Sequence, residues 1–392
     1  MPVLYEENIP TLLAEINKRI NEKVGQEYNF YIDSSTVSDP AKVITWAEIF
    51  SSTTPAEWLA ELGIKPCVVR NGTVLYYLNP NNFAYTASGA NADITTLGND
   101  VMIEIPRLGV RCVKISDTKA CVTITKKPNA TGFDYRAFSY NDYNDSSKLY
   151  VGTYAGFLSD GKLYSSSGKI PSVNGTLANF RAGATARGNG YGVITYSILT
   201  LLQCIYCLMY RHTNSQSMVG TGYTAVSHTE PIVTGASNAY GMNSELCTGT
   251  EQTDSNHHVK FCGIESLWGN VFTFEDGLIK DSSNAVKVAR TLADCADVSK
   301  YDVINSSYTM EGNGFVKKML CENGNIFLPK DLDGSSASYF CDYGSIKAGE
   351  AISVFGGGYM SALYSGIFYR NFQIATNGTG AQYGSRLVYL AR

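Results

Sequence analysis

Two short patterns in the sequence bring together side chains that can perform metal or redox chemistry. Cys204 and Cys207 have the spacing of a CxxC motif, and His228 with Glu230 could supply two ligands of a metal site. A zinc or redox cysteine pair needs a second ligand pair, or a helix N-terminus that lowers the thiol pKa. Neither accompanies these cysteines, so we expect both thiols to pack in the core. Because no histidine lies three to five residues before His228, a metal triad cannot be assembled locally.

The other polar motifs also fall short of a catalytic or cofactor site. His257 and His258 adjoin in a polar segment, where we expect solvated loop histidines. The Glu-Asp-Gly run at 275–277 predicts a turn, because the further oxygen ligands of a calcium loop are missing. Three glycines at 356–358 have no helix after them, which argues against a phosphate-binding loop. We therefore expect no cofactor, no bound metal and no enzymatic activity.

The composition near the C-terminus favours binding through a polar aromatic surface. Tyr359, Tyr364, Tyr369 and Tyr383 are interspersed with Ser and Asn in a chain that contains 27 Tyr and 37 Gly. Tyrosine offers a large contact area for two side-chain torsions, while Asn and Ser adapt their hydrogen bonds to a partner. The alternative is that these tyrosines simply cover a β-rich surface.

Length, charge and hydropathy exclude several other classes of protein. The 392 residues suffice for one large domain or two to three ordinary ones. A net charge of −4 without any Lys/Arg block argues against nucleic acid and anionic membrane surfaces as partners. The apolar run at 194–210 is shorter than the ~20 residues of a membrane span, so we expect a buried helix and no membrane insertion. Without an apolar signal segment at the N-terminus, we expect the ten cysteines to be free thiols in a reducing cytoplasm.

The pattern of elements predicts an α+β fold. Residues 8–25 form an amphipathic helix that either caps its own domain or makes a seam between identical subunits. A second helical region spans 46–62, and Asn71 with Gly72 predicts a β-hairpin. We expect a domain boundary in the Gly/Asn-rich stretch at 88–100. Further predicted elements are strands at 101–106 and 110–115, helices at 177–187 and 193–210, and short strands within long loops after 212.

Several segments, taken in their order along the chain, resemble the C-type lectin fold as bacteriophage tail proteins and retroelement-diversified proteins use it. Residues 263–274, with Trp268, Val271 and Phe274 as a buried set, are similar to a core strand shared with formylglycine-generating enzymes. The segments at 65–80 and 100–107 resemble strands common in phage tail fibres, and 180–216 resembles the helical half of the fold. The resemblance implies an α+β, C-type lectin-like fold of the formylglycine-generating-enzyme variant. A small N-terminal α/β attachment or oligomerisation domain at 1–95 would precede the lectin-like domain at 96–392.

The C-terminal stretch at about 351–392 resembles the variable region of proteins diversified by retroelements. In that family a reverse transcriptase rewrites chosen codons, and the resulting side chains form a ligand-binding face on a constant backbone. The residues that the resemblance assigns to the face are Tyr359, Ser361, Leu363, Tyr364, Tyr369, Asn371, Phe372 and Gln373. The glycines and the closing segment 384–387 would be scaffold, while Met360 departs from the family, which often has Trp there.

The resemblance implies a phage or prophage receptor-binding protein at the tip of the virion tail, made in the cytoplasm of the host bacterium. Its partners would be a host-cell surface receptor, protein or glycan, and other tail proteins, and it would form a homotrimer. A fixed structural tail-fibre component without a ligand is one alternative. A formylglycine-generating-type enzyme is another, although its cysteine pair near the C-terminus is missing, since no cysteine follows Cys341. For the binding protein, replacing Tyr359, Tyr364 and Tyr369 by Ala should abolish adsorption with little change in thermal stability.

Overall fold

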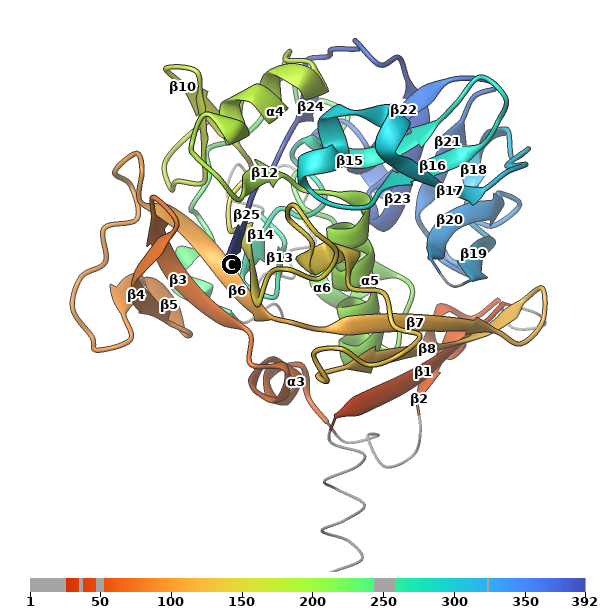
Figure 1. Ribbon diagram of the computed structural model, residues 1–392, viewed down its shortest axis with the longest axis horizontal. Helices are drawn as coiled ribbons and strands as arrows, with labels where there is room; N and C mark the ends of the chain where they lie inside the picture. Colours follow the sequence, from red (N-terminus) through yellow and green to blue (C-terminus); the bar gives the residue numbers. More distant parts are fainter. Residues whose placement is uncertain (1–25, 35–37, 47–52, 243–257, 323, 392) are drawn as a thin grey trace, which may run out of the picture.

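The computed structural model describes residues 26–34, 38–46, 53–242, 258–322 and 324–391 (Figure 1). The predicted helix at 8–25 and His257 lie outside these residues. Among the described residues, the strands form sheets of four, seven and eight strands and three two-stranded pairs, and helices are few. The fold is therefore β-rich α+β. No helix in the described ranges is long and apolar enough to cross a membrane.

The seven-stranded sheet is antiparallel throughout and contains the predicted hairpin. Its strands, in spatial order, are β12 (Tyr191–Val193), β25 (Leu387–Ala391), β9 (Lys148–Gly152), β6 (Asp100–Pro106), β3 (Lys65–Arg70), β4 (Thr73–Asn79) and β5 (Asn82–Thr86). Asn71 and Gly72 join β3 to β4, both with positive φ (48° and 76°). Two positive φ angles characterise the turn that suits the twist of a hairpin, so the hairpin prediction is confirmed.

The strands before residue 95 share their sheets with strands that follow it. β3 pairs with β6 over five residues, and β1 (Glu27–Asp33) pairs with β8 (Lys119–Thr125) over seven. The Gly/Asn-rich segment at 88–100 is therefore a connection between β5 and β6 within one sheet, and not a linker between sheets. Strands on the two sides of the expected division at 95/96 are thus hydrogen-bonded to each other. A local shift in composition does not reveal such long-range strand pairing.

The four-stranded sheet lies at the lower right of Figure 1, and a capped helix follows its first two strands in the chain. Its strands, in spatial order, are β2 (Ile44–Trp46), β1, β8 and β7 (Gly109–Lys114). Helix α2 (Pro40–Val43) precedes β2, and α3 (Pro55–Leu62) begins at a capping box in which Thr54 and Glu57 exchange hydrogen bonds. The predicted helical region at 46–62 is thus confirmed in its second half, whereas its first residue belongs to a strand.

Helix α5 (Tyr196–Tyr210) runs through the centre of the molecule with the sheets around it (Figure 1). All of its residues except Ser197 are buried, which confirms the predicted core helix. Burial raises the pKa of the Cys204 and Cys207 thiols well above the usual value, so the pair packs in the core. The helix predicted at 177–187 is α4 (Leu177–Thr185). A short helix, α6 (Ser215–Val219), follows α5.

The eight-stranded sheet carries the C-terminal segment. Its strands, in spatial order, are β17 (Tyr301–Asn305), β16 (Val286–Ala289), β15 (Phe272–Lys280), β22 (Ala351–Gly356), β23 (Gly366–Ile374), β21 (Tyr343–Ile346) and β18 (Gly312–Phe315), with β24 (Tyr383–Gly384) beside β15. The remaining strand pairs are β10 (Phe157–Ser159) with β11 (Lys162–Tyr164), β13 (Lys260–Phe261) with β14 (Ile264–Glu265), and β19 (Lys318–Glu322) with β20 (Asn325–Asp331). Trp268, Val271 and Phe274 have no exposed surface, as the sequence predicted.

The Glu-Asp-Gly run at 275–277 is not the predicted turn but part of strand β15. Its two carboxylates are buried and each meets an arginine: Glu275 binds Arg370 at 3.0 and 2.7 Å, and Asp276 binds Arg181 at 3.0 and 2.6 Å. Gly277, at a φ of 69°, lies where the register of β15 against β22 shifts. Carboxylates that look exposed in sequence can be buried here because partners distant in sequence neutralise them.

Candidate ligand-binding face

Strands β18, β21 and β23 present polar and aromatic side chains on one side of the eight-stranded sheet. Asn313 of β18 lies opposite Ser345 of β21, and Ser345 lies opposite Asn371 of β23. Since side chains alternate along a strand, residues two positions away share this side. These are Phe315, Tyr343, Tyr369 and Gln373. The alternate positions point to the core.

The loop from 357 to 365 covers one end of these strands and has a tightly held backbone. Gly357 has a φ of 88°, and a Cβ there would lie 2.5 Å from the Cβ of Ser365. The amide Nε2 of Gln216, in α6, donates to the backbone carbonyls of Leu363 and Ser365 at 2.7 and 2.5 Å. The loop backbone is therefore anchored at several points, while the side chain of Leu363 stays 49% exposed.

Tyr364 belongs to a cluster of three rings on this side of the sheet. Its ring centroid lies 4.5 Å from that of Tyr343 and 5.6 Å from that of Phe315, and the latter two meet edge to face at 5.4 Å. Tyr364 nevertheless remains 46% exposed. A ring that is half exposed yet packed on two others offers contact area without much freedom left to lose on binding.

Amide groups continue the surface beside the rings. Gln373 donates from Nε2 to Asn313 Oδ1 at 2.9 Å, and Ser345 also donates its hydroxyl hydrogen to Asn313 Oδ1. Asn371 accepts from the backbone N–H of Gln373 at 2.8 Å. We use the term binding face for Asn313, Phe315, Tyr343, Leu363, Tyr364, Asn371 and Gln373. None of these side chains is charged, so the binding face suits an uncharged ligand surface with hydrogen-bonding groups.

Four of the eight residues assigned from the sequence lie on the binding face, and four do not. Leu363, Tyr364, Asn371 and Gln373 reach the surface together. The other four are buried: Tyr359, Ser361, Tyr369 and Phe372 are 2%, 7%, 6% and 0% exposed.

Each buried residue has a structural partner. Tyr359 clusters with Tyr223 and Ile232. The ring centroid of Tyr369 lies 5.3 Å from that of Phe272, and the ring centroid of Phe372 lies 6.4 Å from that of Tyr308 in the core. The Ser361 hydroxyl accepts from the N–H of Gly358 at 2.8 Å and so shapes the loop. The expectation that Tyr359 and Tyr369 could be removed at little cost in stability does not hold, because both rings are buried.

The sequence analysis did not identify the contributions of β18 and β21 to the binding face. On each strand the two residues that flank a glycine point to this side of the sheet: Asn313 and Phe315 around Gly314, and Tyr343 and the buried Ser345 around Gly344. A Cβ on either glycine would approach Leu332 to within 2.6 Å. The sequence contains this period-two pattern, but it does not show that β18 and β21 pair in register beside β23.

The closing segment at 384–387 is buried scaffold, as the resemblance implied. The Arg386 guanidinium donates to the backbone carbonyls of Gly152, Thr153, Glu265 and Ser266, each at 2.8 or 2.9 Å. These carbonyls come from β9 and β14 and from the residues that follow them. One buried cation therefore ties the C-terminal segment to β9, the neighbour of β25 in the seven-stranded sheet, and to β14 of a separate strand pair.

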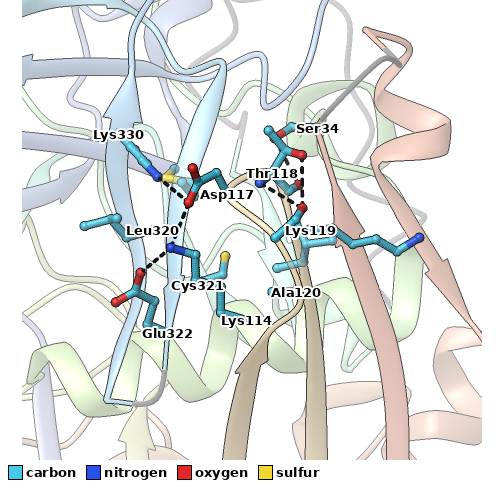
Figure 2. A pocket seen from close by; sticks show the side chains of 13 residues that line it. Ser34, Lys114, Asp117, Thr118, Lys119, Ala120, Leu320, Cys321, Glu322 and Lys330 are labelled. Carbon is cyan, nitrogen blue, oxygen red and sulfur yellow. Dashed lines mark hydrogen bonds and ion pairs between the residues drawn. The ribbon is translucent and has the colours of Figure 1, made fainter.

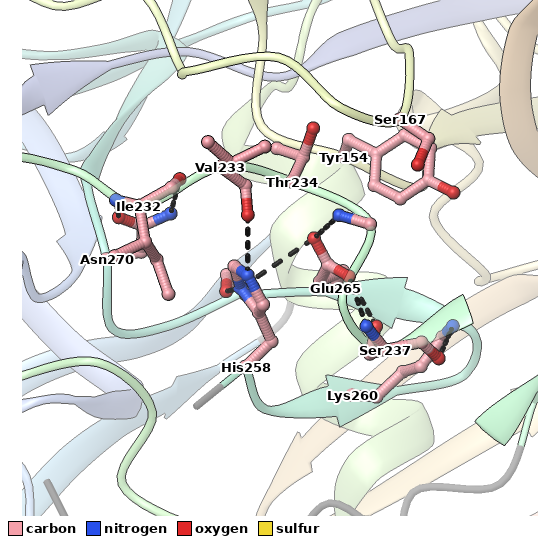
Figure 3. A network of polar contacts seen from close by, with 12 residues as sticks. Tyr154, Ser167, Ile232, Val233, Thr234, Ser237, His258, Lys260, Glu265 and Asn270 are labelled. Atoms are coloured by element: carbon pink, nitrogen blue, oxygen red, sulfur yellow. Dashed lines mark hydrogen bonds and ion pairs between the residues drawn. The ribbon is translucent and has the colours of Figure 1, made fainter. Parts of the chain in front are cut away.

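A second buried network corrects the prediction for His258 (Figure 3). Its side chain is 3% exposed, with Nε2 2.9 Å from the carbonyl of Val233 and Nδ1 2.8 Å from the hydroxyl of Ser266. The neighbouring Glu265 accepts from two backbone N–H groups, those of Gly235 and Ser237, at 2.8 and 3.1 Å. His258 is buried because residues 232–238 fold back over it, a long-range contact that its polar neighbourhood in sequence does not indicate.

Charge and hydrogen bonding keep Glu265 ionised despite complete burial. Burial by itself raises the pKa of this carboxyl, but His258, Lys260 and the hydrogen bonds from Ser237 and Gly235 outweigh it. The resulting pKa lies below the usual value. The network thus anchors the loop at 232–238, which includes Ile232, the neighbour of Tyr359 in the core.

Comparisons with known proteins give remote structural likenesses only. No protein-family model and no curated protein matches the chain. Solved structures similar to it include the U1 variant of the major tropism determinant, at 14% identity and a TM-score of 0.32, over 83% of this chain and 72% of that one. The P3c variant of the same protein has 13% identity and a TM-score of 0.31, over 83% of this chain and 72% of that one. PvdO from Pseudomonas aeruginosa has 12% identity and a TM-score of 0.29, over 76% of this chain and 99% of that one.

Proposed function

We propose that this chain is a receptor-binding protein of a bacteriophage or prophage tail, which adheres to a host-cell surface ligand through the binding face. The main support is the binding face itself, an uncharged patch of tyrosine, phenylalanine and amide side chains on a tightly held backbone. Such patches are typical of adaptable binding surfaces. The ordered motifs that resemble the C-type lectin fold give further support. The fold would be the formylglycine-generating-enzyme variant of the C-type lectin class, and the protein would reside at the tail tip with other tail proteins.

The ligand-binding residues follow from exposure and packing. Leu363, Tyr364, Asn371 and Gln373 would contact the receptor, together with Asn313 and Tyr343 from the neighbouring strands. Individual contacts on a surface of this size need not be strong, because a homotrimer on a virion would present many copies at once.

Diversification of the C-terminal region is part of the proposal. Exposed positions such as 363, 364, 371 and 373 can accept new side chains without disturbing the core, whereas Phe372 and Tyr369 cannot. Codon changes in sister virions would therefore concentrate at the exposed positions. Replacements spread equally over 369 and 372 would contradict a diversified binding face.

Two alternative functions have weaker support. In a structural tail component without a ligand, the binding face would be covered by another subunit. An enzyme of the formylglycine-generating type would need a reactive thiol near the C-terminus. Burial and the neighbouring Asp342 raise the pKa of Cys341, the last cysteine of the chain, to about 12, which is unsuited to a nucleophile.

A cell-binding assay tests the proposal. Labelled protein is titrated onto host cells, and Tyr364→Ala is compared with Tyr85→Ala, which removes a similarly exposed tyrosine (41%) from β5. We expect Tyr364→Ala to weaken binding by about tenfold or more, as for a central interface tyrosine, and Tyr85→Ala to bind normally. Normal binding by Tyr364→Ala, with Gln373→Ala also unaffected, would refute this site.

A further inference from the structure

Strand β18 forms one edge of the eight-stranded sheet, at the right of Figure 1, and contributes Asn313 and Phe315 to the binding face. It pairs with β21 on one side, and in the described part of the chain no strand pairs with its other side. An edge strand with an open side is a place where a further strand can join a sheet. The binding face therefore borders a sheet edge.

The strand register shows which backbone groups of β18 point away from β21. The N–H of Val316 donates to the carbonyl of Asp342 at 2.8 Å, in continuation of the register between β18 and β21. In an antiparallel pair, every second residue makes the hydrogen bonds to the partner strand. Gly314, like Val316, therefore bonds to β21, while Asn313 and Phe315 direct their N–H and C=O groups outward.

Three of these four outward groups are open to a partner. The C=O of Phe315 accepts from the N–H of Gly334 at 2.9 Å. Among the residues that the structure describes, no other backbone group bonds to the N–H of Phe315 or to the N–H and C=O of Asn313. Gly312 and Asn313 are also exposed. The edge thus offers two donors and one acceptor, the kind of groups through which an extended peptide adds to a sheet.

Two other sheet edges are covered or charged. At β5 the N–H of Ala92 donates to the C=O of Ala84 at 2.9 Å, so the chain itself covers that edge. At β7 the side chain of Lys114 binds Asp117 at 2.8 Å and Glu322 of β19 at 3.2 Å (Figure 2). Cover and charge are common ways in which proteins prevent the addition of strands. The sequence of β18, Gly-Asn-Gly-Phe, contains no charged residue and no proline.

We propose that the receptor is a protein and that an extended segment of it adds a strand to β18. The inference rests on the proposed function and deepens it, because it selects protein over glycan as the class of ligand. Alternate side chains of the added strand would lie beside Phe315, whose ring centroid is 5.6 Å from that of Tyr364. Since the binding face is uncharged, these side chains should be uncharged as well. Main-chain hydrogen bonds would then stay the same when the exposed side chains of the binding face change.

The test compares Asn313→Pro with the matched control Asn313→Ala in the titration of labelled protein onto host cells. Both variants lose the side-chain amide, but only proline also removes the outward N–H. We expect Asn313→Pro to bind about tenfold or more weakly than Asn313→Ala, with similar melting temperatures and the same oligomeric state for both. If Asn313→Pro fails to fold, Phe315→Pro and Phe315→Ala give the same comparison at the other outward N–H.

A second arm tests the class of ligand. Proteinase K removes exposed proteins from host cells and leaves glycans, so binding of the unmodified protein to treated cells should fall to background. Retained binding to treated cells would overturn the proposal in favour of a glycan. Equal binding by the proline and alanine variants would also overturn it, and so would a changed oligomeric state of the proline variant, which would assign the edge to a second copy of the chain.

The same assay separates this inference from the proposed function. If Tyr364→Ala weakens binding while the proline and alanine variants at 313 bind equally, the binding face stands and strand addition fails. If Tyr364→Ala, Gln373→Ala and Asn313→Pro all bind normally, both fail.

Discussion

The buried ion pair beneath the binding face is expected to be a main determinant of its stability. Arg370 lies on β23 between Tyr369 and Asn371, but its side chain points inward to Glu275. Arg370 is 1% and Glu275 0% exposed. Arg370→Met keeps much of the side-chain volume and leaves Glu275 as a buried carboxylate without its partner.

The cost follows from the burial and geometry of the pair. Removing one partner of a buried ion pair typically lowers the free energy of unfolding by about 3–5 kcal/mol. Arg370 also donates to the carbonyl of Phe327, which would lose its partner. Replacing both charged residues, as in Arg370→Met with Glu275→Gln, should recover about 2 kcal/mol of that loss, because no unpaired charge remains.

Acidification should reduce the effect of Arg370→Met. Burial raises the pKa of Glu275 above its usual 4.5 even when Arg370 is present, and without Arg370 the pKa should rise further. A folded state that keeps its proton while the unfolded state has lost it becomes less stable as pH rises. The destabilisation should therefore be smaller at pH 5 than at pH 8. At pH 8 the folded variant must either bury an unpaired carboxylate or keep a proton that the unfolded chain has released, and both lower the free energy of unfolding.

Urea unfolding followed by tryptophan fluorescence measures these differences, since the buried Trp268 reports on the core. A cost below about 1 kcal/mol for Arg370→Met would be that of an ordinary surface substitution and would refute the reasoning. An effect that is the same at pH 5 and pH 8 would show that the loss does not come from an unpaired Glu275.

Three further predictions separate scaffold from binding residues. Phe372→Ala should lower the free energy of unfolding by about 3–5 kcal/mol and Tyr364→Ala by less than about 1 kcal/mol, as measured by urea unfolding; equal losses would contradict the assigned exposures. Gly357→Ala should lower the melting temperature and weaken cell binding, because the new Cβ would collide with Ser365 and because residue 357 has a positive φ; a wild-type melting curve would refute the close contact. Gln216→Ala should weaken binding several-fold with a small change in stability, because it releases the loop, and unchanged binding would show that the loop holds its shape without it.

Local chemistry explains which elements were predictable from the sequence. The Asn71-Gly72 turn and helix α5 were both correct, because turn residues and a continuous apolar run act over a few neighbouring positions. The prediction for residues 275–277 was wrong, since two arginines about 95 positions away decide that these carboxylates are buried. His258 was misjudged for the same reason.

The sequence by itself determined the chemical character of the C-terminal region: tyrosines, amides and glycines, with three arginines as the only charged residues between 351 and 392. Only the tertiary structure decided which of those side chains are available to a ligand. Tyr359, Tyr364 and Tyr369 are alike in type and neighbourhood, yet the first and last are buried under Tyr223 and Phe272 while Tyr364 is open. Exposure depends on strand register and on what packs across the sheet, and both are set by residues far away in the chain.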